Sequence, residues 1–150
     1  MGKPTKAKSK PTKPSRKSAA PQTSLAGVYT NVETLLREWM PPFKAGDFTV
    51  KGKESLQLVT PKPIAIPGAY GGKPLPHQFA AVILQKGYVG LYLMGVYSNP
   101  ALKKKISPAL LKTLKGKSCF HLKTADESMK EDIRMALGAS AAIYRKRGWM

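Results

Sequence analysis

The stretch FAAVILQKGYVGLYLMGVY, residues 79–97, decides the fold of this 150-residue chain. Residues 79–85 and 88–97 form two apolar runs rich in β-branched and aromatic side chains, which favour strands. Lys86 and Gly87 separate the runs, as expected for a two-residue hairpin turn. Because both runs are apolar at odd and even positions, we expect the hairpin to lie at the centre of a sheet. Gly90 has no side chain and is expected to leave a gap on one face.

Weaker signals on either side of the hairpin complete the expected order of elements. Strands are predicted at 54–60, 64–66 and 117–123, with Pro61 and Pro63 forcing either an edge position or a break between the first two. Helices are predicted at 31–40, after Ser107-Pro108 and at 126–147, the first and last opened by capping boxes at 30–33 and 124–127. The sequence therefore predicts an α+β fold, with an antiparallel sheet of about four or five strands and helices packed mainly on one face.

Residues 1–23 differ in composition from the rest of the chain. They contain seven cations, no acid, and prolines that interrupt any helix. We therefore expect a disordered basic Lys/Pro/Ser tail at 1–23, followed by a single α+β domain at 24–150. The tail is interpreted as a solubilising extension, as an arm that contacts phosphates without reading sequence, or as a targeting peptide. Its candidate polyanion-binding residues are Lys3, Lys6, Lys8, Lys10, Lys13, Arg16 and Lys17.

The positive charge is not confined to the tail. The chain has 26 Lys and Arg against eight Asp and Glu, a net charge of +18, and residues 24–150 keep 19 of those cations and all eight acids. This excess predicts affinity for nucleic acid, an anionic membrane surface or an acidic partner. Cys119 is the only cysteine, so the chain cannot form an intramolecular disulfide, and a reducing compartment is the simplest interpretation. No apolar run approaches the roughly 20 residues that span a bilayer, and we expect a cytoplasmic protein.

A candidate ligand groove follows from the strand pattern. Alternation places three side chains of the second central strand on one face, and it gives Cys119 and His121 a shared face of the last strand. Such a surface could stack bases or line a small-molecule groove, or it could be covered by the N-terminal helix or a second copy. Two ligands are too few for a structural zinc site. The alternative interpretation is that Cys119 is a structural residue and His121 is polar lining. The candidate groove residues are Tyr88, Tyr92, Met94, Cys119 and His121.

Two segments resemble a known family. FAAVILQKGYVGLYLM at 79–94 and LLKTLKGKSCFHLK at 110–123 are similar to the corresponding segments of YdhG-like proteins, small bacterial α+β proteins mostly of unknown function. The resemblance covers about residues 30–149 and implies the same fold. Some members are described as frataxin-like iron-binding proteins, so the resemblance also raises iron binding. Iron sites of that kind use exposed carboxylates, and the acids that cluster here are Asp126, Glu127, Glu131 and Asp132.

Two functional hypotheses remain from different classes. The first is a non-enzymatic binding protein whose tail and domain engage polyanions such as nucleic acid without sequence specificity. The second is a small-molecule or iron-binding domain that uses the groove near Tyr92, Cys119 and His121. No catalytic residue and no cofactor is predicted, and the sequence leaves the oligomeric state open. Further candidate polyanion-binding residues form a basic run at the rim, Lys103, Lys104 and Lys105.

Overall fold

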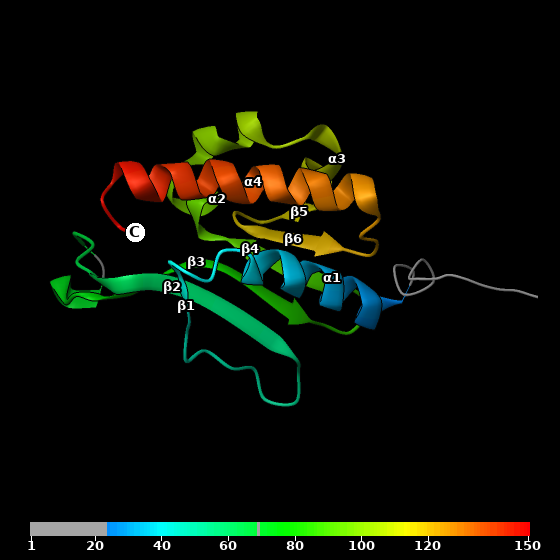
Figure 1. The fold of residues 1–150 in the computed structure, drawn as a ribbon, viewed down its shortest axis with the longest axis horizontal. Helices are drawn as coiled ribbons and strands as arrows, with labels where there is room; N and C mark the ends of the chain where they lie inside the picture. Colours follow the sequence, from blue (N-terminus) through cyan, green and yellow to red (C-terminus); the bar gives the residue numbers. More distant parts are fainter. Residues whose placement is uncertain (1–23, 69) are drawn as a thin grey trace, which may run out of the picture.

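A six-stranded antiparallel sheet forms one layer of the domain, in the strand order β1-β2-β3-β4-β6-β5 (Figure 1). The computed structural model describes residues 24–68 and 70–150, so the predicted tail lies outside the described residues. The strands are β1 (Lys44–Ala45), β2 (Ser55–Ile64), β3 (Leu75–Leu84), β4 (Val89–Leu93), β5 (Leu114–Lys115) and β6 (Cys119–Leu122). The helices are α1 (Leu25–Arg37), η2 (Tyr70–Gly72), α2 (Met94–Ser98), η3 (Pro100–Lys105), α3 (Pro108–Leu111) and α4 (Glu127–Lys146). The predicted α+β class with an antiparallel sheet is confirmed.

The predicted hairpin forms β3 and β4 at the centre of the sheet. The Gln85 N–H donates to the Tyr88 carbonyl at 2.9 Å, and Gly87 adopts a positive φ of 92° in the turn between them. The second run was predicted to stay extended to residue 97, and this was wrong. β4 ends at Leu93 and the chain continues as the short helix α2. Apolar periodicity did not distinguish a strand from a helix after Leu93, because a short apolar run suits a buried strand and a buried helical turn equally well.

Both capping boxes were predicted at the wrong residue. α1 begins at Leu25, where the Ser24 side chain accepts a hydrogen bond from the Gly27 N–H at 3.0 Å. Inside that helix the Thr30 hydroxyl donates to the Ala26 carbonyl instead of capping. α4 starts after Asp126, which accepts from the Met129 N–H at 2.8 Å. Ser and Asp are both strongly preferred at the N-cap. Ser24 takes this position in α1 in place of Thr30, and Asp126 takes it in α4 in place of Thr124.

Two further boundaries differ from the prediction. β2 runs through Pro61 and Pro63 as one strand, because a register shift against β3 between Val59 and Pro63 removes the need for regular ladder bonds there. The helix after Ser107 is capped as predicted, with the Ser107 hydroxyl accepting from the Leu110 N–H. It ends at Leu111, and Leu114 and Lys115 then pair with β6 as the short strand β5.

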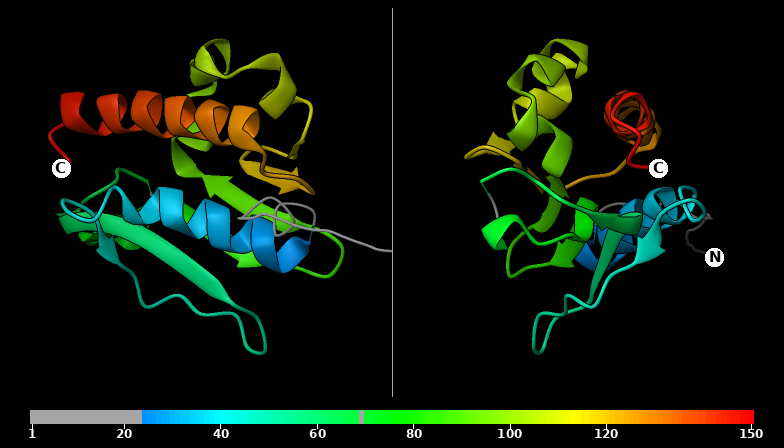
Figure 2. Two further views of the ribbon diagram at one scale, coloured as in Figure 1. Left: turned by 45° about the vertical axis from the view of Figure 1, so that its right-hand side comes forward. Right: turned by 90° about the vertical axis from the view of Figure 1, so that its left-hand side faces the viewer.

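The helices cover one face of the sheet, as predicted. α1 and α4 run side by side across that face, and α2, η3 and α3 pack against α4 (Figures 1 and 2). Alternate strand residues such as Leu58, Val82 and Leu91 share one buried cluster with residues of α1, α2, η3, α3 and α4. No helix among the described residues is long and apolar enough to cross a membrane.

An aromatic cluster closes one end of this core. Phe43 stacks on Phe79 with ring centroids 3.9 Å apart, and Tyr144 meets both rings edge-on. The Tyr144 hydroxyl donates to the Gln78 carbonyl of β3, which attaches the last turns of α4 to the sheet. Burial raises the pKa of Tyr144 well above its usual value, so the phenol stays neutral.

α2 packs closely on α4 at Gly95. A Cβ added to Gly95 would lie 2.3 Å from the Ser140 Oγ and 3.3 Å from the Leu102 Cδ2. Ser140 is fully buried and its hydroxyl has no hydrogen-bond partner in the described part of the chain. The small residues of α4 therefore allow α2 to pack closely.

We expect Gly95→Ala to lower the free energy of unfolding by about 1–3 kcal/mol, because the new methyl group overpacks the contact with Ser140. Urea unfolding measures the change. Ser140→Ala should be neutral or stabilising, since it removes a buried hydroxyl without a partner, and it should reduce the cost of Gly95→Ala in the double variant. Gly138→Ala is the control, because no atom lies within 4 Å of its Cβ position. Equal losses for Gly95→Ala and Gly138→Ala would contradict this packing.

Candidate ligand-binding face of the sheet

The face of the sheet opposite the helices, the open face, carries four of the five predicted groove residues. Tyr92 of β4 pairs directly with Cys119 of β6, and Gly90 pairs with His121 two positions further along. Tyr88 precedes β4 at the position that alternation assigns to the same face. All four side chains are partly exposed, whereas their neighbours Leu91 and Phe120 point into the core.

Stacked rings form the centre of the open face. Tyr88 lies flat on His121 with ring centroids 3.9 Å apart and planes 12° from parallel. The Tyr92 ring fills the space above Gly90, where an added Cβ would meet the Tyr92 Cε1 at 3.0 Å. The gap predicted at Gly90 is therefore occupied by the chain's own aromatic ring. Gly90 allows the three rings to gather on a surface that solvent reaches.

Tyr92 and Cys119 form a polar pair within this aromatic surface. Their side chains are hydrogen-bonded to each other, and the Gln85 side chain also bonds to the Tyr92 hydroxyl. Burial, followed by the Cys119 interaction, raises the pKa of Tyr92 to about 12. Burial also raises the pKa of Cys119, while its bond to Tyr92 lowers that pKa by a smaller amount. Cys119 is therefore a thiol near neutral pH, which is the opposite of an activated nucleophile.

A fourth ring extends the surface toward the edge of the sheet. Phe48, in the loop between β1 and β2, is nearly half exposed. It lines a cavity of about 170 Å³ with Gln78, Ala81, Ile83 and Tyr92. Its backbone N–H donates to the Gln57 side chain at 3.3 Å, which fixes the loop against β2. The rings of Phe48, Tyr92, Tyr88 and His121 therefore lie on one face of the sheet.

Lysines surround these rings. Lys115 pairs with Cys119 across β5 and β6 and so shares the open face. Lys53 donates a hydrogen bond to the Gln85 side chain, and Lys123 follows β6 directly. Lys117, in the turn between β5 and β6, lies 5.8 Å from the Tyr97 ring centroid. These four lysines are exposed, and none of them forms an ion pair with an acid in the described part of the chain.

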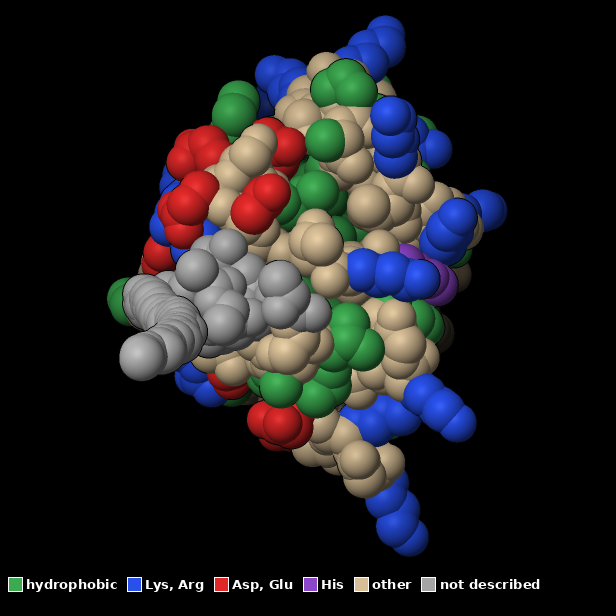
Figure 3. Space-filling model, turned by 90° about the vertical axis from the view of Figure 1, so that its right-hand side faces the viewer, with side chains coloured by type: hydrophobic (Ala, Val, Ile, Leu, Met, Phe, Trp, Pro, Cys, Tyr) green, Lys and Arg blue, Asp and Glu red, His purple; other side chains and the backbone are tan. Residues whose placement is uncertain are grey.

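Negative charge is concentrated on the helical layer. Six of the eight acids lie in α1, directly after it, or in the cap and first half of α4. Arg134 of α4 pairs with Glu38 at 3.6 Å and with Glu131 at 3.5 Å. Figure 3 shows acidic side chains gathered on one side of the molecule and basic side chains along the opposite edge. The acids therefore pair with Arg37, Lys130 and Arg134 of the helical layer. The cations without an acidic partner among the described residues include those around the open face, on η3 and at the end of α4.

The structure does not bring Met94 to the predicted groove. Met94 is the first residue of α2, since the strand ends one residue earlier. It lines a different cavity, which also contains His77 and Trp149. Sequence reasoning assigned Met94 to the groove only because it continued the alternation of β4 by one step too many.

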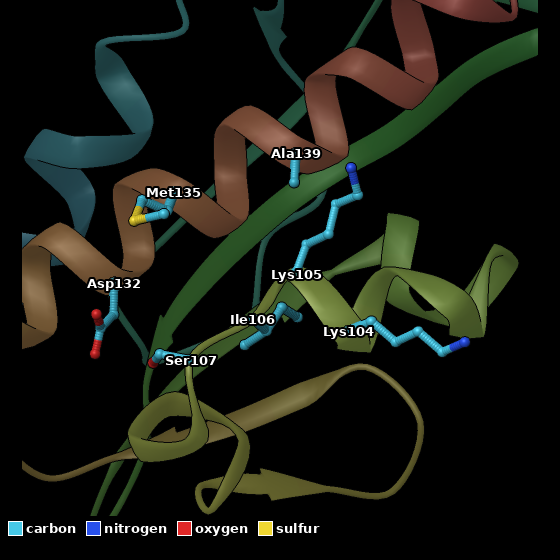
Figure 4. Close-up of a pocket in the computed structure, with 7 residues that line it drawn as sticks. All are labelled: Lys104, Lys105, Ile106, Ser107, Asp132, Met135 and Ala139. Carbon is cyan, nitrogen blue, oxygen red and sulfur yellow. The ribbon is translucent and has the colours of Figure 1, made fainter.

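The basic run at residues 103–105 lies apart from the rings, on η3. Lys104 and Lys105 line a cleft of about 520 Å³ between η3 and α4, with Asp132 and Met135 on the opposite wall (Figure 4). In this view Lys105 extends toward Ala139, whereas Lys104 points away from α4. Lys103 is exposed on the same helix. These three lysines stay predicted phosphate contacts, separate from the open face.

No group of three or more His, Cys, Asp or Glu side chains able to hold a metal ion occurs in residues 24–68 and 70–150. Comparison of the chain with protein-family models, curated proteins and solved structures finds no match in any of the three. The YdhG-like resemblance and the iron binding that it raised therefore stay predictions.

Sequence reasoning missed two parts of this face. Neither Phe48 nor Lys115 was among the candidate site residues. Both depend on two-residue strands, which are too short to leave a periodic signal. The available signal in this loop was Phe48 itself, an aromatic residue directly after Gly46 and Asp47.

The pKa shift of Cys119 predicts slow alkylation. The rate constant with iodoacetamide should rise with pH through an inflection above that of the urea-unfolded chain, because burial disfavours the thiolate. Tyr92→Phe should move the inflection still higher, since it removes the hydrogen bond that lowers the Cys119 pKa. Cys119 is the only thiol, so the unfolded chain is an internal reference. An inflection below that of the unfolded chain would show that the site activates the thiol.

Proposed function

We propose that this protein is a non-enzymatic binding module that engages polyanions, single-stranded nucleic acid in particular, on the open face of its sheet and without sequence specificity. The observation that carries the proposal is the set of solvent-accessible rings on that face within a border of unpaired lysines. Bases stack on aromatic rings whatever their identity, and lysines attract the backbone between them. An open sheet is a flat surface on which consecutive unstacked bases can lie.

The charge distribution supports this orientation of the ligand. A polyanion approaching α1 and the first half of α4 meets their acids, whereas one approaching the open face meets lysines with no acidic partner among the described residues. Such asymmetry steers an anionic ligand toward one side of a small protein. The tail lysines and Lys103, Lys104 and Lys105 are proposed to add phosphate contacts outside the stacking surface.

The alternative of a small-molecule groove at Tyr92, Cys119 and His121 has weaker support. The cavity beside Tyr92 measures about 170 Å³, whereas pockets for drug-sized ligands are usually about 300–1,000 Å³. Cys119 and His121 are already engaged by Tyr92 and Tyr88, respectively. A shallow surface of aromatic rings therefore suits the stacking of bases better than the enclosure of a small molecule.

Substitution of Tyr88 tests the stacking surface. In the full-length chain, we expect Tyr88→Ala to weaken binding of a fluorescent oligothymidylate by roughly 5- to 100-fold, because one base loses its stacking partner. Fluorescence anisotropy measures the dissociation constant. Met135→Ala is the control, since Met135 is also a large exposed side chain but lies on α4 in the helical layer. Equal dissociation constants for Tyr88→Ala and the unsubstituted protein would exclude Tyr88 as a stacking partner.

Truncation before Ser24 separates the tail from the domain. Removing seven cations should reduce the slope of log affinity against log salt by up to about five, at roughly 0.7 per phosphate contact on a single strand. The shortened protein should still lose affinity on Tyr88→Ala by the same factor as the full chain. If the shortened protein loses all detectable binding at low salt, the open face is not a binding site and the tail alone carries the interaction.

A further inference from the structure

The cavity that Met94 lines has a volume of about 650 Å³ and lies at the end of the sheet where β3 begins, next to the last residues of the chain. Its walls come from the segment after β2, from β3, from α2 and from the residues that follow α4. This volume is within the usual range for small-molecule sites. The lining residues are Ile66, Pro67, His77, Met94, Tyr97, Ser98, Arg147 and Trp149.

The cavity has apolar and aromatic walls. Met94 and Tyr97 contribute one side from α2, and Trp149 contributes another. Tyr97 is more than half exposed, which is unusual for a large ring that borders a hydrophobic hollow. The Trp149 indole is held edge-on against Tyr144 and His77, with centroids 5.1 Å away in both cases. A planar aromatic ligand could therefore contact rings without rearranging the core.

His77 brings an unsatisfied polar atom to this cavity. Its Nε2 is buried and has no hydrogen-bond partner in the described part of the chain. The ring lies between Tyr144 and Trp149, and the backbone N–H of His77 donates to the buried Thr60 hydroxyl at 2.9 Å. Because the Nε2 has almost no accessible surface, a ligand in the cavity reaches it only after a small turn of the ring. A buried polar atom left without a partner is costly, and a ligand that supplied one would recover that cost.

Arg147 places a positive charge at the same cavity. Its guanidinium lies 5.0 Å from the Trp149 ring centroid, and it forms no ion pair with a described acid. The guanidinium is close enough to His77 to lower the pKa of that imidazole, a smaller effect than the burial of the ring. Because both groups contribute positive charge or donors to one space, an anion between them would be favoured.

We propose that this cavity binds a small aromatic carboxylate, whose ring lies among Met94, Tyr97 and Trp149 and whose carboxylate meets Arg147 and His77. The charge of the ligand follows from Arg147, and its aromatic character follows from the walls. The site shares no residue with the open face, so it does not rest on the proposed nucleic-acid binding. It gives the domain a second ligand of a different chemical class.

The test uses the full-length protein and 2-naphthoate, with the neutral 2-naphthylmethanol as a matched probe. The chain contains two tryptophans, so indole N–H signals in a proton–nitrogen correlation spectrum report separately on Trp149 and on Trp39. We expect 2-naphthoate to shift the Trp149 signal and leave that of Trp39, which packs on Phe79, unchanged. The neutral probe should bind at least about tenfold more weakly, because it lacks the charge that pairs with the guanidinium.

Three variants identify the groups responsible. Arg147→Met keeps the apolar stem and should weaken 2-naphthoate binding by about tenfold or more, to the level of the neutral probe. Arg145→Met is the control, since it removes an exposed cation two residues away that does not line the cavity. His77→Phe keeps a ring between Tyr144 and Trp149 but removes the Nε2. It should weaken the binding of 2-naphthoate more than the binding of 2-naphthylmethanol.

Two results would overturn the proposal. The first is the absence of a shift at Trp149 with millimolar 2-naphthoate. The second is equal binding of the two probes with no difference between Arg147→Met and Arg145→Met. Neither result would affect oligothymidylate binding at the open face, which depends on Tyr88 and its neighbours.

Discussion

Pairing between β3 and β4 is the constraint on which the rest of the structure depends. Their register places Val82 opposite Leu91, and both side chains enter the core beneath α1 and α4. The same register sends Tyr92 and its neighbours to the other face, since a strand alternates its side chains. Burial of one face by the helices and exposure of rings on the other are therefore two consequences of one arrangement. A slip of one residue in this register would turn the core side chains to the open face and the rings into the core.

The sequence predicted the parts of the fold that repeat over several residues. The hairpin, its Lys86-Gly87 turn and the helix over most of 127–146 follow from apolar periodicity and turn chemistry. It did not predict where β4 becomes α2, because the change depends on Gly95 meeting Ser140, a contact between residues 45 positions apart. The two-residue strands and the cavity at His77 depend equally on distant segments. Four of the five groove residues were predicted correctly, because alternation along the strands is enough to place them on one face. Met94 was predicted wrongly, because β4 ends at Leu93.

Acids and lysines serve different purposes in this domain. Acids cap and bridge the helices, where Asp126 closes the start of α4 and Arg134 joins α1 to α4. Lysines remain around the open face, where they repel one another unless an anion lies between them. This repulsion opposes the compact state slightly, and binding of a polyanion would relieve it. The aromatic cavity at the end of the sheet lies near the C-terminus, where Arg147 provides a more localised positive charge.

Chemical-shift mapping of the isotope-labelled full-length protein with an oligothymidylate tests the central claim most directly. If the open face binds the strand, the backbone signals that move should belong to β4, β6 and the loop carrying Phe48, and the changes should saturate together. The signals of α1 and of the first half of α4 should stay in place, because the sheet separates them from the ligand. Shifts confined to η3 and α4, with Tyr88, Tyr92 and His121 unchanged, would contradict the account.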